Sequence, residues 1–172
     1  MANPRARWLA QRTLLIVGEG RHEECFLQHV KALYVPRGCG LTVTIGNARG
    51  KGARHVIDWT ARQVSNKAYD KVAALLDTDT DWSPAVAAIA RKKRIVVLKS
   101  EPCLEALLLR VLGRAPAGDA DSLKRQLRAI IGDPADKKSY AALFAASILE
   151  ASRNREPAID DLLMLLPPVA RS

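Results

Sequence analysis

Short apolar runs separated by polar segments recur along the chain and are typical of β-strands. They lie at residues 13–17, 41–45, 72–76 and 95–98. The runs at 13–17 and 72–76 are continuous, which is typical of parallel strands buried on both faces. The run at 41–45 alternates apolar and hydroxyl side chains, which indicates a half-exposed strand.

The segments between these runs carry apolar residues at helical spacing. They predict helices at 23–34, about 53–64, 84–90 and from Pro102 to Gly113. Pro102 suits the first turn of a helix and Gly113 suits its end. Strands that alternate with helices of this length need crossover connections, so we expect an α/β fold with a parallel sheet of about four strands and helices on both faces.

Only helical patterns follow Gly113. One predicted helix is marked by Leu123, Leu127, Ile130 and Ile131, and another by Tyr140, Leu143, Phe144, Ser147 and Ile148. We therefore expect a C-terminal helical extension on the sheet. The predicted organisation is a basic arm at 1–12, a core at 13–112, a helical extension at 113–166 and a loose tail at 167–172.

Composition limits the class of protein. The chain has 172 residues, 48% of them hydrophobic, and no apolar run approaches the ~20 residues that a membrane span needs. Its 3 cysteines form no Cys-x-x-Cys pair, which favours buried thiols over a disulfide scaffold or a structural zinc site. We expect a cytoplasmic protein with no membrane association.

Basic residues exceed acidic ones. There are 27 lysines and arginines against 18 acids, a formal net charge of +9. An excess of this kind attracts polyanions, so nucleic acid is the expected partner. Solubility alone is the alternative explanation.

Carboxylates follow two of the apolar runs directly. Glu19 lies between two glycines after the first run, with Glu23 one helical turn later, and Asp77 and Asp79 follow the third run at a spacing of two. Ligands of open α/β sheets gather beyond the carboxyl ends of the strands, so these acids are expected to meet in one crevice and to bind a divalent cation. Glu23 could instead complement the start of a helix, and the aspartates could form a solvated turn.

Glu105 lies in a predicted helix that is apolar nearly all round. A buried carboxylate needs a partner, which could be Arg110 or Lys99 in an ion pair, or a metal or catalytic site. Lys138 belongs to a lysine pair that precedes a helix, an unfavourable place for cations unless an anion lies nearby. His22 borders the first acidic cluster and is a secondary catalytic candidate.

Two glycine-rich segments do not match nucleotide-binding loops. Residue 23 is Glu where a dinucleotide loop needs its third glycine, and Gly52 replaces the Ser or Thr of a phosphate loop. The acidic run at 77–81 also lacks the glycine and distal glutamate of an EF-hand. The loop at 46–52, with Arg49, Lys51 and Arg54, could bind a nucleic-acid backbone phosphate or be an ordinary solvated loop.

Together these motifs resemble a known family. Gly18-Glu19-Gly20-x-x-Glu23 and Asp77-Thr78-Asp79 resemble the TOPRIM domain of topoisomerases, primases and small nucleases. Ser100-x-Pro102-x-x-Glu105 and Lys138-Ser139 resemble the RloB family, relatives of the OLD-type nucleases associated with phage defence and abortive infection. This chain has Glu101, Leu104 and Arg110 where that family usually has Asn, an aromatic residue and His.

The resemblance implies a metal-dependent nuclease that acts on RNA or DNA. It implies that Glu19, Glu23, Asp77 and Asp79 bind one or two Mg²⁺ or Mn²⁺ ions. It further implies a catalytic site in which Glu19 acts with Glu105 as a further ligand or base, and Lys138 stabilises charge. An ATPase, if needed, would be a separate partner protein. A ribosomal RNA maturase and a decayed nucleic-acid-binding module are the alternative functions.

Overall fold

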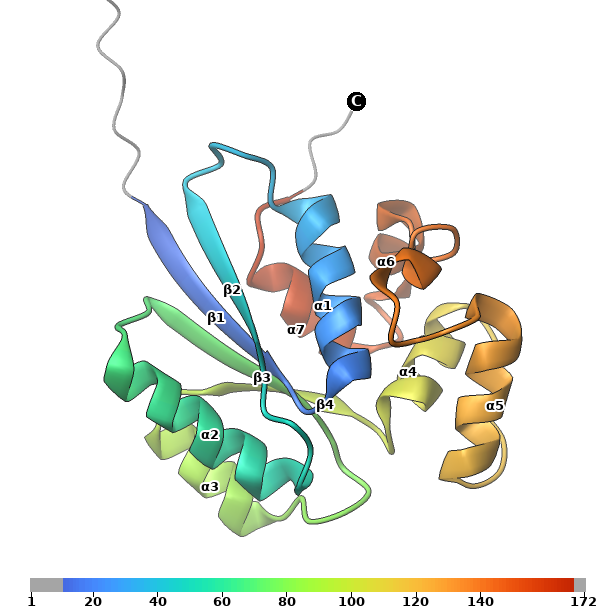
Figure 1. Ribbon diagram of the computed structural model, residues 1–172, viewed down its shortest axis with the longest axis horizontal. Helices are drawn as coiled ribbons and strands as arrows, with labels where there is room; N and C mark the ends of the chain where they lie inside the picture. The colour runs from blue at the N-terminus through green and yellow to red at the C-terminus, as the bar shows by residue number, and fades with distance from the viewer. Residues whose placement is uncertain (1–10, 169–172) are drawn as a thin grey trace, which may run out of the picture.

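A four-stranded parallel sheet forms the centre of the computed structural model, which describes residues 11–168 (Figure 1). Its strands are β1 (Arg12–Gly18), β2 (Leu41–Asn47), β3 (Lys71–Asp77) and β4 (Val96–Ser100). Their order in the sheet is β2-β1-β3-β4, and every neighbouring pair is parallel. The predicted α/β class is confirmed, and the arrangement is consistent with a TOPRIM-like fold.

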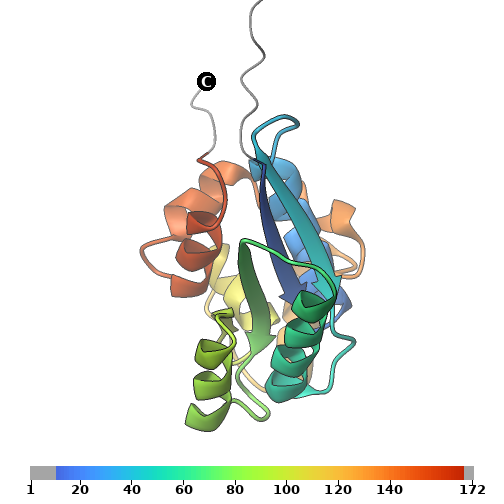
Figure 2. The ribbon, with the colours of Figure 1, turned by 90° about the vertical axis from the view of Figure 1, so that its left-hand side faces the viewer.

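Helices cover both faces of the sheet. The chain forms α1 (Arg21–Tyr34), α2 (Gly52–Asn66), α3 (Pro84–Lys92), α4 (Leu104–Val111), α5 (Ala120–Ile131), the 3₁₀ helix η1 (Lys137–Tyr140), α6 (Ala146–Ser152) and α7 (Pro157–Met164). In Figures 1 and 2, α2 and α3 lie on one face, whereas α1 and the helices from α4 onward lie on the other. No helix within residues 11–168 combines the length and apolar character that crossing a bilayer requires.

Alternating side chains of the central strands pack into two separate hydrophobic cores, one on each face of the sheet. Leu14 and Ile16 of β1 pack with α1 and the C-terminal helices, while Leu15 and Val17 pack with α2 and α3. Successive side chains of a strand point to opposite faces, so a strand covered on both sides must be apolar throughout. The continuous apolar run of β1 follows from this double burial.

Two predicted helices begin or end elsewhere in the structure. The fourth helix starts at Leu104, not at Pro102, and Cys103 is its N-cap. The helix predicted around Tyr140 to Ile148 is wrong as one element, because η1 ends at Tyr140 and α6 begins only at Ala146. Tyr140 and Phe144 are nevertheless both fully buried. Their spacing reflects contact with one aromatic cluster rather than one continuous helix.

The predicted terminal segments lie largely beyond the described residues. Of the expected basic arm at 1–12, residues 1–10 are outside them, and β1 already begins at Arg12. Of the expected tail at 167–172, residues 169–172 are outside them.

Candidate functional site

The carboxyl ends of β1, β3 and β4 bring the predicted acids together. Glu19 follows β1 directly, and its Oε2 accepts a hydrogen bond of 3.2 Å from the backbone N–H of Asp77 at the end of β3. The Asp77 carboxylate in turn accepts a bond of 2.9 Å from the backbone N–H of Leu104, at the start of α4. These bonds join two strand ends and one helix start, as the parallel order predicts.

Glu23 enters the same region from α1. Its side chain is buried, and its Oε2 accepts a hydrogen bond of 2.8 Å from the backbone N–H of Gly20 at the N-cap. Glu23 therefore complements the start of its helix, which was one of its two possible roles. Gly18 permits this close approach, because a Cβ at that position would lie 2.6 Å from the Cβ of Glu23.

Glu105 pairs with His22, not with Arg110 or Lys99. The distance from Glu105 Oε1 to His22 Nδ1 is 3.1 Å, and Glu105 is only 4% exposed. The ion pairs considered for Glu105 from the sequence are wrong, because both cations have other partners. The pairing links α1 with α4 across 83 residues of sequence.

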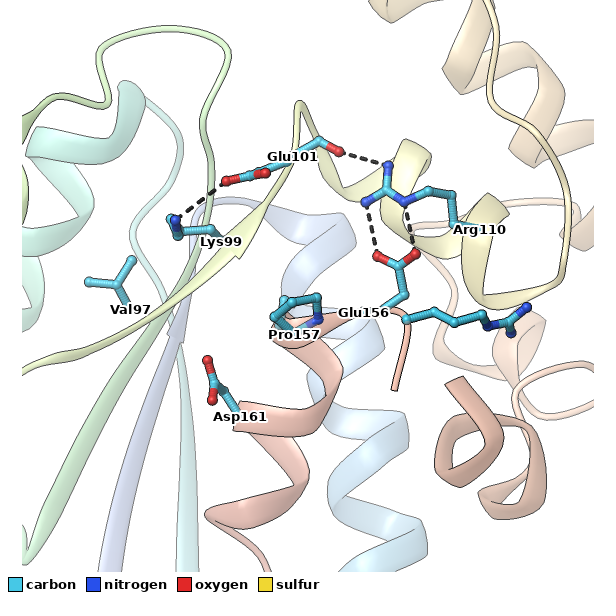
Figure 3. Close-up of a pocket in the computed structure, with 9 residues that line it drawn as sticks. Val97, Lys99, Glu101, Arg110, Glu156, Pro157 and Asp161 are labelled. Carbon is cyan, nitrogen blue, oxygen red and sulfur yellow. Dashed lines mark hydrogen bonds and ion pairs between the residues drawn. The ribbon is translucent and has the colours of Figure 1, made fainter. Parts of the chain in front are cut away.

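Arg110 and Lys99 instead line a pocket of about 450 Å³ (Figure 3). Arg110 donates two hydrogen bonds to the buried Glu156 carboxylate, at 2.9 and 3.0 Å, and a third to the backbone carbonyl of Glu101. Lys99 lies 3.4 Å from the carboxylate of Glu101. The lining of this pocket includes none of the five predicted metal-binding acids.

Burial and the crowding of like charges raise the pKa values of carboxylates in the cluster. Burial, with the negative charges of Glu23, Glu19, Glu105 and Asp79, raises the pKa of Asp77 to about 9. Burial also raises the pKa of Glu23, although the backbone bond from Gly20 opposes it. The cluster therefore lacks enough positive charge to hold all its carboxylates ionised.

Glu105, which pairs with His22, is the carboxylate of the cluster whose pKa is lowered. Burial acts to raise the pKa of Glu105, but the hydrogen bond with His22 and the other polar contacts outweigh burial and lower this pKa overall. The same hydrogen bond raises the pKa of His22 against the opposing effect of burial. The hydrogen bond thus favours an ionised Glu105 carboxylate together with a protonated His22 imidazole.

The cluster has the carboxylate oxygens that a hard cation prefers, but its described residues do not have the arrangement of ligands that would bind one. Within residues 11–168, no group of three His, Cys, Asp or Glu side chains is placed to hold a metal ion. The donors nevertheless fit Mg²⁺ or Mn²⁺, because Glu19, Glu23, Asp77 and Glu105 supply carboxylate oxygens. Cation binding would require these side chains to exchange internal hydrogen bonds for metal ligation.

Asp79 lies at the rim of the cluster. Its carboxylate is exposed and accepts a hydrogen bond of 3.0 Å from the Thr80 hydroxyl. Its charge still acts on Asp77. Asp81 faces away toward α2, where its two carboxylate oxygens accept backbone N–H bonds from Ala53 and Arg54, at 2.6 and 3.2 Å.

The loop before α2 carries the predicted cations Arg49 and Lys51 and contacts the residue Glu19. Gly50 donates its backbone N–H to the carbonyl of Glu19 at 2.7 Å, which holds this loop against the end of β1. Arg49 and Lys51 are exposed there, and both have left-handed backbones, with φ of 63° and 77°. Arg54 is paired with Asp58 at 2.9 Å.

Lys138 is exposed on η1, and the hydrogen bonds and ion pairs found within residues 11–168 do not connect its side chain with the acids. The charge of Arg128 on α5 also acts on His22, where it opposes the rise in pKa that the hydrogen bond with Glu105 causes. The sequence gives little sign of Arg128, because its proximity depends on how α5 packs.

Ser100 belongs to the motif Ser100-x-Pro102-x-x-Glu105, but no role was predicted for it. Its hydroxyl is fully buried and has no hydrogen-bond partner among residues 11–168. Ser100 is the register partner of Asp77, so the two side chains point to the same face of the sheet. An unpaired buried hydroxyl is costly, so this position is polar for a reason other than packing.

Comparison with family models, with curated proteins and with solved structures finds no match for this chain.

Proposed function

We propose that this protein is a metal-dependent nuclease that hydrolyses phosphodiester bonds in RNA or DNA. The observation that carries the proposal is the convergence of Glu19, Glu23, Asp77 and Glu105 at one edge of the sheet, in a protein of net charge +9. Crowded buried carboxylates destabilise a fold unless a cation compensates them. A basic protein with a local cation site suits a polyanionic substrate.

The proposed division of labour follows the contacts of each side chain. Glu19, Glu23 and Asp77 would hold Mg²⁺ or Mn²⁺, which when bound supplies an activated water and neutralises charge on the departing oxygen. Glu105, whose pKa the hydrogen bond with His22 lowers, would accept a proton. Arg49 and Lys51 would hold the substrate backbone beside Glu19.

The resemblance to RloB relatives extends this proposal to a biological role. On this proposal the nuclease would act in phage defence in the cytoplasm, and any ATPase function would belong to a separate partner. The ribosomal RNA maturase type differs in substrate, so cleavage of ribosomal precursors, tRNA and plasmid DNA would separate the two.

A nucleic-acid-binding module without catalysis is the second candidate. It is favoured by the lack, within the described part of the chain, of a ready group of three metal ligands, and by Arg110, which Glu156 occupies. Titration with Mn²⁺ in a calorimeter separates the two functions. Binding that Asp77→Asn removes supports the nuclease, whereas no Mn²⁺ binding supports the module.

Asp77→Asn is the sharpest test of activity. Asparagine keeps an oxygen that can accept the bond from Leu104, so it removes the charge while the start of α4 is preserved. Loss of a residue that only supports a metal ligand costs about 10–100-fold, so loss of a ligand should lower Mg²⁺-dependent cleavage by more than about 100-fold.

Asp81→Asn is the matched control. Asp81 belongs to the same acidic run and also accepts backbone N–H bonds, but its carboxylate faces α2. Its cleavage rate should stay within about threefold of the wild type, since it removes a charge outside the cluster. Unchanged cleavage in Asp77→Asn, or equal loss in both variants, would contradict the proposed site.

A further inference from the structure

A run of four consecutive cations ends α3 at the opposite end of the sheet from the acids. Arg91, Lys92, Lys93 and Arg94 are all exposed, and within residues 11–168 none of their side chains forms an ion pair with an acid. The negative end of the helix dipole accounts for cations in the last turn, Arg91 and Lys92. It does not account for Lys93 and Arg94, which lie beyond the helix.

Backbone hydrogen bonds hold these cations on a short, ordered turn. Lys93 donates its N–H to Ile89, Arg94 donates to Arg91, and Ile95 donates to Ala90, all at 2.9–3.0 Å. Arg94 has a φ of 56°, in the left-handed region where helices usually end on glycine. A cation is therefore kept where glycine would cost less backbone energy. We call residues 91–94 the basic turn.

An apolar groove leads from the basic turn toward the acidic end of the sheet. It has a volume of about 420 Å³, lies between α3 and the edge strand β4, and is lined by Trp82, Ala87, Ile95 and Val97, with Arg91 and Lys99 as its cations. Trp82 directly follows the run of acids at 77–81, whereas Arg91 belongs to the basic turn. The nine residues of α3 set the length of the groove at about 13 Å.

We propose that this groove and the basic turn bind a single strand of nucleic acid, with a base against Trp82 and phosphates on the cations. The inference rests on the proposed function, because it names the single strand as substrate and gives the path by which it leaves the acids. Aromatic and apolar walls bind unstacked bases, while cations at the end of the groove bind the backbone. A duplex buries its base faces and would leave the apolar wall unused.

The test is binding of the full-length protein in EDTA to a labelled oligo-dT or oligo-U of about 12 nucleotides, measured by fluorescence anisotropy. Without metal no cleavage occurs, so binding is measured independently of catalysis. Lys92→Glu combined with Lys93→Glu should weaken binding more than about tenfold and lower the salt slope by at least about 1.4, at about 0.7 per lost phosphate contact.

The matched control reverses two exposed cations of α5, Lys124→Glu with Arg125→Glu. Its net charge equals that of the test variant, so it should bind within about threefold of the wild type if location matters beyond total charge. Trp82→Ala should weaken binding about tenfold and Trp82→Phe much less, because phenylalanine also stacks on bases. The surface charge variants keep the test valid even if Trp82→Ala lowers stability.

Several outcomes would overturn the inference. Equal loss in the two charge variants would indicate binding to net charge alone, and preference for a duplex of the same length would rule out the single-strand groove. Competition by polyglutamate as strong as by oligo-dT, with no effect of Trp82→Ala, would assign the surface to an acidic protein partner. Loss of cleavage in Asp77→Asn with unchanged oligonucleotide binding in the basic-turn variant would leave the nuclease standing and remove this groove from it.

Discussion

The pKa of Asp77 in the acidic cluster is strongly shifted. Its carboxylate holds the start of α4 through Leu104, while its own backbone N–H holds Glu19. Burial and four neighbouring acids raise its pKa to about 9. An aspartate chosen only to cap a helix would be placed where its charge is stable. Its position among like charges is an observation that supports the proposed cation site.

The pH dependence of the free energy of unfolding should reveal the raised pKa of Asp77. The pKa of Asp77 is about 9 in the folded chain and ~3.9 in the unfolded chain, so the folded state holds its proton more tightly. The free energy of unfolding should therefore fall as pH rises from about 4 to about 9. Asp77→Asn removes this loss and should stabilise the protein by at least about 1 kcal/mol at pH 8, with little effect near pH 4.

Urea unfolding of wild type and Asp77→Asn at pH values from 4 to 8 measures this effect. The difference between the two proteins should widen steadily with pH, and adding Mn²⁺ at pH 8 should stabilise only the wild type. Parallel stability curves would show that Asp77 is ionised in the folded protein and that crowding does not govern it.

At the residue scale, the sequence is informative where chemistry is local. Glu19 and Asp77 could be predicted because each follows its own strand, and the parallel sheet brings the strand ends together. The partner of Glu105 could not, because His22 lies 83 residues away and reaches it only through the packing of α1 on α4. Ser100 was part of a motif, but only its burial without a hydrogen-bond partner in the described part of the chain marks it as unusual.

At the element scale, α2 depends on a side chain from another loop. Its N-cap residue, Lys51, has a left-handed backbone and provides no side-chain cap. Asp81 of the β3–α3 loop supplies both missing acceptors, to Ala53 and Arg54. Gly52 leaves room for it, because a Cβ there would lie 2.7 Å from Asp81 Oδ1. The start of α2 is thereby tied to the β3–α3 loop.

Removing this cap should cost a typical capping energy. Asp81→Ala is expected to lower the free energy of unfolding by about 1 kcal/mol, because two backbone N–H groups of the first turn of α2 lose their acceptor. Asp161→Ala, which removes an exposed acid on α7, is the control and should change stability by less than about 0.5 kcal/mol. Equal effects in chemical denaturation would show that Asp81 does not cap α2.

The helices that the sequence misplaces are those whose ends depend on tertiary contacts. The strands and the helices of the core follow from local periodicity. Between Tyr140 and Ile148 the pattern suggests one helix, but η1 and α6 are separate because Tyr140 and Phe144 turn inward against Phe26. The start of α4 similarly depends on Asp77, which lies 27 residues earlier.

On the scale of the whole molecule, the C-terminal helices share a core with the sheet. Leu14 and Ile16 of the sheet, Leu127 of α5 and Ile159 of α7 belong to one cluster of buried side chains. The Tyr140 hydroxyl lies 3.4 Å from the backbone carbonyl of His22, next to the acidic cluster. The helical extension therefore supports the site itself, and the sequence could not show this because extension and site are separate in the chain.

Phe144→Ala should destabilise the entire protein rather than the extension alone. The ring is fully buried and contacts Phe26 and Tyr140, with centroid separations of 6.1 and 5.7 Å, so its loss should cost about 3–5 kcal/mol. Trp59 of α2 and Trp82, which precedes α3, are partly buried and pack against the opposite core. Because one cooperative unit is expected, tryptophan fluorescence and helical circular dichroism should move to the same lower midpoint of denaturation.

Leu143→Ala, at a partly exposed neighbour, should shift both midpoints far less. A fluorescence midpoint that stays at the wild-type value while the helical signal falls would mean that the sheet folds without its extension, and that the His22 side of the site could be lost while the sheet remains intact.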